Sequence, residues 1–250
     1  MEITVLGSGG TAPTRSRACS SFLVDGKIMI DAGPGSFYNL RKFQMDPLQI
    51  QAVLLTHLHG DHLFDLPTLI WGMAADGRKE TLLVYGPGGT RDAVKALLEA
   101  GRTPKTFVAY DVEVHDIFPG QSLKVGAFNV NTAAGMHTIQ DAAYRLELGS
   151  LSATFSGDTQ PSDEVVKLAS KTDVLFHEAS FLGLEEEQAR TTGHTTATQA
   201  GEVARMAEAR ALVLTHITPR LGEKQEELVS EARAKFRNAA VSFDGLTVVI

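Results

Sequence analysis

The chain has 250 residues, enough for one large domain with a substantial buried core or for two fused halves. Its formal net charge is −7, with 23 Lys and Arg against 30 Asp and Glu, which argues against a broad basic surface for nucleic acid. The single cysteine, Cys19, excludes an internal disulfide and a zinc–thiolate cluster, and it favours a reducing compartment.

The N-terminal residues read as a strand at 2–6 and not as a basic segment followed by an apolar one. This pattern predicts no signal peptide. No apolar run approaches the roughly 20 residues that a membrane-spanning helix needs. We therefore expect a cytoplasmic protein with no membrane partner.

Hydrophobic periodicity predicts alternating strands and helices in the first half of the chain. A glycine-rich loop at 7–14 follows the first strand, but it lacks the Lys-Ser/Thr ending of a phosphate-binding loop. Asp25-Gly26 separates two β runs and indicates a hairpin. The strands expected here are 3–6, 20–24, 27–30, 52–55 and 81–85, the helices are 36–44, about 61–75 and 90–100, and several short β runs fill 106–133.

The second half repeats this alternation, with another hairpin at Gly149-Ser150. Two similar halves that mix strands with helices predict two sheets packed face to face with helices outside. We expect one domain over 1–250, with halves of about 1–130 and 131–250. The strands expected in the second half are 144–148, 152–156, 173–176, 211–214 and 246–250, and the helices are 163–169, 195–209 and 223–237.

The most informative stretch follows the buried strand at 52–55, where His57, His59, Asp61 and His62 fall within six residues. Imidazole nitrogens and carboxylate oxygens are the ligands that zinc and similar ions prefer. His57 and His59 alternate, so both can turn toward one ion, while Asp61 and His62 enter a helix and can serve a second ion. One ion needs three or four protein ligands, so this density predicts two ions.

Other polar residues also follow predicted strands, where the loops at one rim of an α/β fold converge on a common crevice. Asp158 and Glu178 lie at such positions, and Asp31 ends the strand at 27–30. Asp31 is either a turn residue or a carboxylate that orients a ligand loop. Spacing alone leaves open which of the later histidines bind metal, the candidates being His137, His177, His194 and His216.

The order of these residues resembles the ligand series of the metallo-β-lactamase superfamily across nearly the whole chain. The resemblance implies an αββα sandwich, the metallo-β-lactamase-like fold, with two Zn²⁺ ions between the sheet edges; Mn²⁺ or Fe²⁺ are alternatives. An aspartate stands where a cysteine would mark a true β-lactamase, which favours the hydrolase and phosphodiesterase branches. The implied ligands are His57, His59 and His137 for one ion, Asp61, His62 and His216 for the other, and Asp158 as a bridge.

Within that superfamily the sequence is similar to the ribonuclease Z family, whose members trim tRNA 3′ ends. The resemblance implies that His194 donates a proton to the leaving oxygen and that Glu178 tunes it. Asp61 then orients or deprotonates the nucleophile, a hydroxide that bridges the two ions. The motifs that carry this resemblance are Leu6-Gly7-Ser8-Gly9 with Pro13-Thr14, Arg17 and Ser20-Ser21, then His177-Glu178-Ala179-Ser180 and Gly193-His194-Thr195-Thr196.

The family's long arm, which grips the tRNA elbow, has no counterpart, because 144–148 runs through Gly149-Ser150 directly into 152–156. With the acidic net charge, this argues against tRNA and for a small anionic ester, foremost a phosphodiester. The resemblance also implies a homodimer.

Two alternatives keep the same metal site. One is an arylsulfatase-like enzyme or a hydrolase of carboxylic esters or lactones, for which Trp71, Phe181 and Leu182 could line an apolar pocket. The other is a metal-binding subunit without activity, against which the intact ligand series argues.

Overall fold

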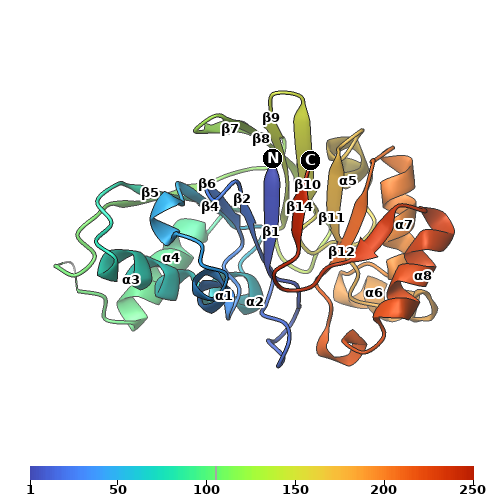
Figure 1. Cartoon of the computed structure of the whole chain (residues 1–250), viewed down its shortest axis with the longest axis horizontal. Coiled ribbons are helices and arrows are strands. Elements are labelled where there is room, and N and C mark those ends of the chain that lie inside the picture. Colours follow the sequence, from blue (N-terminus) through green and yellow to red (C-terminus); the bar gives the residue numbers. More distant parts are fainter. Residues whose placement is uncertain (105) are drawn as a thin grey trace.

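Two seven-stranded sheets lie face to face at the centre of the structure, a computed structural model that describes residues 1–104 and 106–250 (Figure 1). Across the first sheet the strands are β14 (Thr247–Val249), β1 (Glu2–Gly7), β2 (Ser21–Val24), β3 (Ile28–Ile30), β4 (Ala52–Leu54), β5 (Leu82–Gly86) and β6 (Val112–Asp116). The pairs from β14 to β3 are antiparallel, and β3 to β6 run parallel to one another.

The second sheet repeats this arrangement with later segments of the chain. Its strands, in order across the sheet, are β13 (Ala239–Val241), β12 (Leu212–Thr215), β11 (Val174–Glu178), β10 (Leu151–Phe155), β9 (Ala142–Leu148), β8 (Phe128–Ala134) and β7 (Ser122–Val125). Here β7 to β10 are antiparallel and β10 to β13 are parallel. After β6 the chain crosses from the first sheet to the second, and its last strand, β14, returns to the first sheet.

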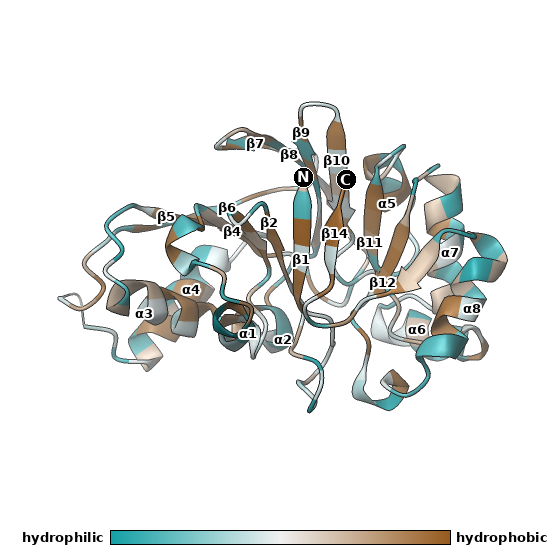
Figure 2. Ribbon diagram, viewed as in Figure 1, coloured by the Kyte–Doolittle hydropathy of each residue, from teal (hydrophilic) through white to brown (hydrophobic). Residues whose placement is uncertain are grey.

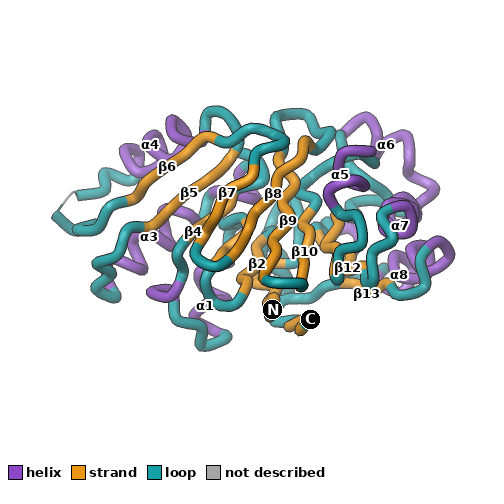
Figure 3. The backbone as a smooth tube through the Cα atoms, turned by 90° about the horizontal axis from the view of Figure 1, so that it is seen from above, coloured by secondary structure: helices purple, strands orange, loops and turns teal. Residues whose placement is uncertain are grey.

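Helices lie outside the pair of sheets, so the layers follow the order helix, sheet, sheet, helix (Figure 1, Figure 3). On the side of the first sheet are α1 (Ser36–Lys42), α2 (Gly60–Leu63), α3 (Leu66–Ala75) and α4 (Thr90–Ala100). On the side of the second are α5 (Asp163–Leu168), α6 (Glu186–Thr192), α7 (Ala197–Met206) and α8 (Gln225–Lys235). Short 3-10 turns occur at η1 (Pro47–Gln49), η2 (Gly183–Glu185) and η3 (Pro219–Leu221).

The central strands are buried on both faces, which explains why their sequences are continuously apolar (Figure 2). Successive strand residues point to opposite faces of a sheet. In β4, Leu54 therefore enters the core between the sheets while Val53 packs against the helices, and in β11 Phe176 and Leu175 divide in the same way. Each sheet is thus held by two apolar layers.

The expected sandwich of two sheets with helices outside is confirmed. The helix expected at about 61–75 is instead two helices, α2 and α3. Asp65 lies at the break, where its carboxylate accepts the Phe37 N–H at 2.8 Å, and Pro67 is the second residue of α3, where its fixed backbone suits the first turn. The sequence does not predict α6 or β13, because such short elements carry little periodicity.

No helix in the described part of the chain is both long enough and apolar enough to cross a membrane. The division into one domain with halves of about 1–130 and 131–250 stays a prediction.

A hydrogen bond from Tyr144 joins the two sheets next to the histidine-rich loop. Its hydroxyl donates to the Leu55 carbonyl at 2.7 Å, and both residues are fully buried. We expect Tyr144→Phe to lower the free energy of unfolding by about 1–3 kcal/mol, because the Leu55 carbonyl loses its buried partner. Urea unfolding measures this loss. Tyr110→Phe, which removes a buried bond to the Ile70 carbonyl on the helix side, is the matched control and should cost a similar amount. An unchanged midpoint for Tyr144→Phe would contradict the expectation.

Candidate metal centre

The predicted ligands meet at one rim of the sandwich, where strands from both sheets end. The loops that follow parallel or neighbouring strand ends point into a common crevice. The residues at this rim are His57, His59, Asp61 and His62 between β4 and the end of α2, His137 after β8, Asp158 after β10 and His216 after β12.

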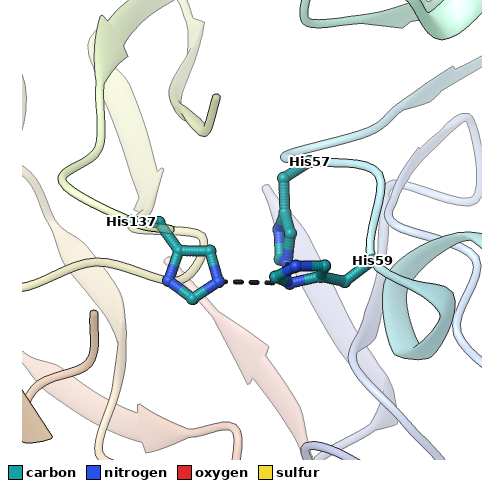
Figure 4. A group of neighbouring side chains, drawn as sticks. All are labelled: His57, His59 and His137. Carbon is teal, nitrogen blue, oxygen red and sulfur yellow. Dashed lines mark hydrogen bonds between the residues drawn. The ribbon is translucent and has the colours of Figure 1, made fainter. Parts of the chain in front are cut away.

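Three histidines form the first group at this rim (Figure 4). Nε2 of His57 and Nε2 of His137 lie 3.1 and 3.2 Å from Nδ1 of His59. Nitrogen ligands at ~2.0–2.1 Å from a tetrahedral zinc ion lie roughly 3.3 Å from one another. The spacing of these three nitrogens therefore fits ligands that share one ion.

The protons of two of these rings lie on the side away from the group. Nδ1 of His137 donates to the Gly193 carbonyl at 2.8 Å, and Nδ1 of His57 lies 3.2 Å from a carboxylate oxygen of Asp141. In the tautomer that these contacts favour, each ring presents its Nε2 to His59. A proton on Nδ1 of His59 could satisfy only one of them well, whereas a cation satisfies all three nitrogens.

Two histidines and two aspartates form the second group. Nε2 of His216 lies 3.3 Å from Asp61 Oδ2 and 3.2 Å from Asp158 Oδ2, and Nε2 of His62 lies 3.5 Å from Asp158 Oδ1. Asp158 also approaches the first group, because its Oδ2 is 3.7 Å from Nε2 of His57. This carboxylate therefore stands between the two groups.

The histidines of the second group also have acceptors behind them. Nδ1 of His62 donates to Asp31 Oδ2 at 2.7 Å. Nδ1 of His216 lies 2.8 Å from the Ser180 hydroxyl, whose own proton is donated to Glu178, so the hydroxyl accepts from His216. Asp31 combines the two roles left open above, because it has a positive φ of 57° at the strand end and also orients His62.

Electrostatics favour the protonation state that a metal ligand needs at His57 and Asp158, and a protonated ring at His62. Burial lowers the pKa of His57 well below its ordinary value, which keeps the ring neutral. Burial alone would raise the pKa of Asp158, but His216 and His62 hold it well below its usual range. Burial likewise would lower the pKa of His62, but Asp158 and Asp31 raise it well above normal. A proton and a cation therefore compete for Nε2 of His62.

Two buried atoms at the centre have no hydrogen-bond partner among the described residues, namely Nε2 of His62 and Oδ1 of Asp158. Such atoms are costly to bury unless something else binds them. Within each group the potential ligand atoms lie within 4.8 Å of one another. The His/Asp cluster is consistent with a binuclear metal site, and its nitrogen and oxygen donors suit zinc, manganese or iron.

His194 and Glu178 form a pair beside these groups. Nδ1 of His194 lies 2.9 Å from Glu178 Oε1, and the fully buried carboxylate also accepts the Thr159 N–H and the Ser180 hydroxyl, each at 2.7 Å. The His194 ring stacks on His216 with the centroids 5.5 Å apart. Burial would lower the pKa of His194, but the charge and hydrogen bond of Glu178 raise it to about 9. The pair can thus hold a proton next to the metal ligands.

Asp141 belongs to the site although the sequence does not indicate it. It is buried beside His57, and its Oδ2 accepts the Asp158 N–H at 3.1 Å. Burial, reinforced by the charge of Asp158, raises the pKa of Asp141 well above its ordinary value. It lies four residues after His137 and directly before β9, a position that neither motif nor periodicity distinguishes.

His177, one of the histidines left open by spacing, is not in any candidate ligand group of the described residues. It is fully buried, and its Nδ1 donates to the Glu178 carbonyl at 2.9 Å. Its place is therefore in the core behind the site.

Of the three apolar residues proposed to line a pocket, one adjoins the site. The ring centroid of Phe181 is 6.1 Å from that of His194. Leu182 packs into the core under the outer helices, and Trp71 packs against Phe107.

The glycine-rich loop after β1 closes one side of the centre. The Thr11 N–H donates to Asp61 Oδ2 at 2.7 Å. Gly10 lies so close to His216 that a Cβ on it would stand 2.3 Å from the imidazole ring. This loop therefore holds two candidate ligands in place.

Comparison with known proteins agrees with this geometry. Residues 27–217 match the family model described as the beta-lactamase superfamily domain. The chain belongs to the metallo-β-lactamase superfamily. Ribonuclease Z from Methanothermobacter thermautotrophicus is 28% identical to this superfamily member, over 100% of this chain and 97% of the relative.

Two solved structures share this metallo-β-lactamase fold over the whole chain. The metallo-β-lactamase fold protein YhfI from Bacillus subtilis has a TM-score of 0.86 at 25% identity and covers 99% of both chains. The short form of human tRNase Z has a TM-score of 0.85 at 25% identity, over 100% of this chain and 99% of the other. The predicted superfamily and fold are confirmed, and the chain is a metal-dependent hydrolase related to ribonuclease Z.

The chain is shorter than its alignment with the ribonuclease Z of Methanothermobacter thermautotrophicus. The alignment spans 301 positions and the chain has 250 residues, so at least 51 positions stand opposite gaps in this chain. The hairpin of β9 and β10 turns directly at Gly149-Ser150. No arm is inserted at this hairpin, all of whose residues are described.

Gly10→Ala tests whether the loop after β1 positions His216. The added Cβ would overlap the ring, so we expect the variant to bind metal at least about 10-fold more weakly. Metal content after dialysis against a weak chelator, measured by mass spectrometry, reports the loss. Gly101→Ala is the control, because its Cβ would have no neighbour closer than 3.5 Å. Full retention of metal by Gly10→Ala would contradict the expectation.

Proposed function

We propose that this protein is a two-metal phosphodiesterase that cleaves small phosphodiesters. The observation that carries the proposal is the His194–Glu178 pair, held 2.9 Å apart beside two groups of potential ligands. A phosphodiester with an alkoxide leaving group needs both charge neutralisation and a proton donor. Full-length similarity to ribonuclease Z supports the same chemistry.

The proposed ligands follow the geometry of the two groups. They are His57, His59 and His137 for one ion, Asp61, His62 and His216 for the other, and Asp158 between them. Bound divalent ions would supply Lewis-acid chemistry, neutralising charge on the phosphoryl oxygens and making water more acidic. Zinc is the ion we propose first, with manganese or iron as alternatives.

The protein's own residues then accept and donate the protons of the reaction. Asp61, whose Oδ2 is held by the Thr11 N–H, orients the attacking water or accepts its proton. As the new P–O bond forms, the bond to the leaving oxygen breaks, and His194 gives that oxygen its proton. Glu178 keeps the His194 ring oriented and favours its protonated form, because its carboxylate stabilises the imidazolium.

The size of the substrate follows from what surrounds the centre. The turn at Gly149-Ser150 leaves no arm at the β9–β10 hairpin, and the chain carries a net charge of −7. Both features argue against a grip on the body of a tRNA. We therefore place tRNA below a small phosphodiester as the substrate.

Two further properties of the proposal rest on the family relationship and the sequence. We propose a homodimer, by likeness to ribonuclease Z. We propose a cytoplasmic location, where the buried free thiol of Cys19 stays reduced. An arylsulfatase-like or carboxylic ester activity is the second candidate, and the phenyl ring of Phe181 next to His194 is the feature that favours it.

A substrate panel on protein of known metal content tests the function. We expect two metal ions per chain and faster hydrolysis of bis(p-nitrophenyl) phosphate than of p-nitrophenyl sulfate, an acyl ester or a pre-tRNA. Removal of the metal with a chelator should abolish turnover, and re-addition of zinc should restore it. Preference for the sulfate or the acyl ester would keep the site and overturn the substrate. Protein that binds no metal after reconstitution would overturn the whole proposal.

The role of His194 can be separated from that of the metal site by changing the leaving group. We expect His194→Ala to lower kcat by about 10²–10⁴-fold on a diester with an alkyl alkoxide leaving group, which must be protonated as it departs. A nitrophenyl diester needs little protonation and should lose much less activity. His115→Ala, on β6 and outside the ligand groups, is a control histidine variant. Equal losses on both diesters would contradict the assignment of His194 as the acid.

A further inference from the structure

Asp141 is a buried side chain, and contacts to polar groups of the described residues involve only one of its two carboxyl oxygens. Its side chain is inaccessible to solvent, its Oδ2 lies 3.2 Å from Nδ1 of His57, and the same oxygen accepts the Asp158 N–H at 3.1 Å. Oδ1 has no hydrogen-bond partner among the described residues. A solitary carboxyl buried in this way costs free energy unless it serves the groups it contacts.

The fold makes room for this carboxyl. A Cβ on Gly135 would lie 2.3 Å from Asp141 Oδ1, and a Cβ on Gly157 would lie 2.5 Å from Oδ2. Larger residues at either position would displace the carboxyl from His57. Two glycines therefore pack directly against the Asp141 carboxyl and leave the space that it occupies.

The hydrogen bonds around Thr56 show what Asp141 adds. The Thr56 hydroxyl has one proton, which it donates to Asp31 at 3.0–3.1 Å. Toward Nδ1 of His57, 3.1 Å away, that hydroxyl can only accept. Asp141 Oδ2 is a second acceptor on the same side of the ring. Together they favour a proton on Nδ1 of His57 and leave the Nε2 lone pair facing His59.

We propose that Asp141 is a positioning residue that orients His57 for one metal ion, as Asp31 orients His62 for the other. The inference rests on the proposed metal centre and assigns one buried carboxyl to each half of it. Asp141 also holds the backbone of Asp158, so it aligns the residue between the two groups with His57.

The two carboxyls differ in a way that makes the proposal testable. Asp31 uses both oxygens, Oδ1 for the Thr56 N–H and Oδ2 for His62, so the amide of Asn cannot replace it. Asp141 uses only Oδ2, so an Asn oxygen in that position can serve His57 and Asp158 equally well. Asn should therefore be tolerated at 141 and harmful at 31.

The experiment compares Asp141→Ala, Asp141→Asn, Asp31→Asn and the double variant Asp31→Asn/Asp141→Ala. Zinc affinity is measured by competition with a chromophoric chelator, and the ligand field by the visible spectrum of the Co²⁺-loaded protein. We expect Asp141→Ala and Asp31→Asn each to bind one ion about 10–100-fold more weakly and to change the Co²⁺ spectrum. Asp141→Asn should stay within a few-fold of the wild-type affinity for both ions.

Thermal unfolding separates positioning from a structural role. Measured against its own metal-free midpoint, Asp141→Ala should lose part of the rise that zinc produces in the wild-type protein. The double variant should bind both ions weakly, because the two carboxyls serve different ions.

Wild-type affinity for both ions in Asp141→Ala would overturn the inference, as would an Asp141→Asn variant that folds but binds as weakly as Asp141→Ala. One tightly held ion in the double variant would overturn the assignment of one carboxyl to each ion. Failure of the wild-type protein to bind zinc would instead overturn the proposed function.

Discussion

Lone pairs that point at one another are the constraint on which this structure depends. His57, His137, His62 and His216 each have Nδ1 next to an acceptor, so each ring turns Nε2 toward the same small region, where it offers a lone pair once that nitrogen carries no proton. Asp158 and Asp61 add negative oxygens there. Such a region is unfavourable when it holds only lone pairs and becomes favourable when it holds cations. The buried acceptors are therefore as much a part of the site as the ligands.

The sandwich supplies the rigidity that this arrangement requires. Four of the candidate ligands come from the segment between β4 and the end of α2, while the others come from three loops of the second sheet. These loops stay in register because the strands before them pack against one another across the central core. Direct links between the sheets, such as Tyr144 to Leu55 and the Ala142 N–H to the Thr56 carbonyl at 2.8 Å, act next to the loop itself.

Membership of the metallo-β-lactamase superfamily and the proposed substrate depend on different parts of the molecule. The family rests on the match over residues 27–217 and on whole-chain likeness to ribonuclease Z. The substrate depends on what surrounds the rim, where His194 and Phe181 stand on one side and the short β9–β10 turn leaves no arm. The rim can change its substrate while the buried centre keeps its ligands, because loops vary more freely than packed strands.

The sequence by itself determined the elements whose signal is local. Short apolar runs identify the strands, and the dense His-x-His-x-Asp-His motif indicates a metal site without any knowledge of the fold. It also placed the other polar residues at strand ends, and with the family resemblance it named Asp158 and His216.

Only the tertiary structure decided relations between residues far apart in the chain. It separated His177, in the core, from His194, on the rim, although spacing treats them alike. It also placed Asp141 beside His57 and Asp31 beside His62, over sequence distances of 84 and 31 residues. Periodicity reports which face of an element is apolar, whereas the partner of a buried polar atom is set by how the two sheets pack.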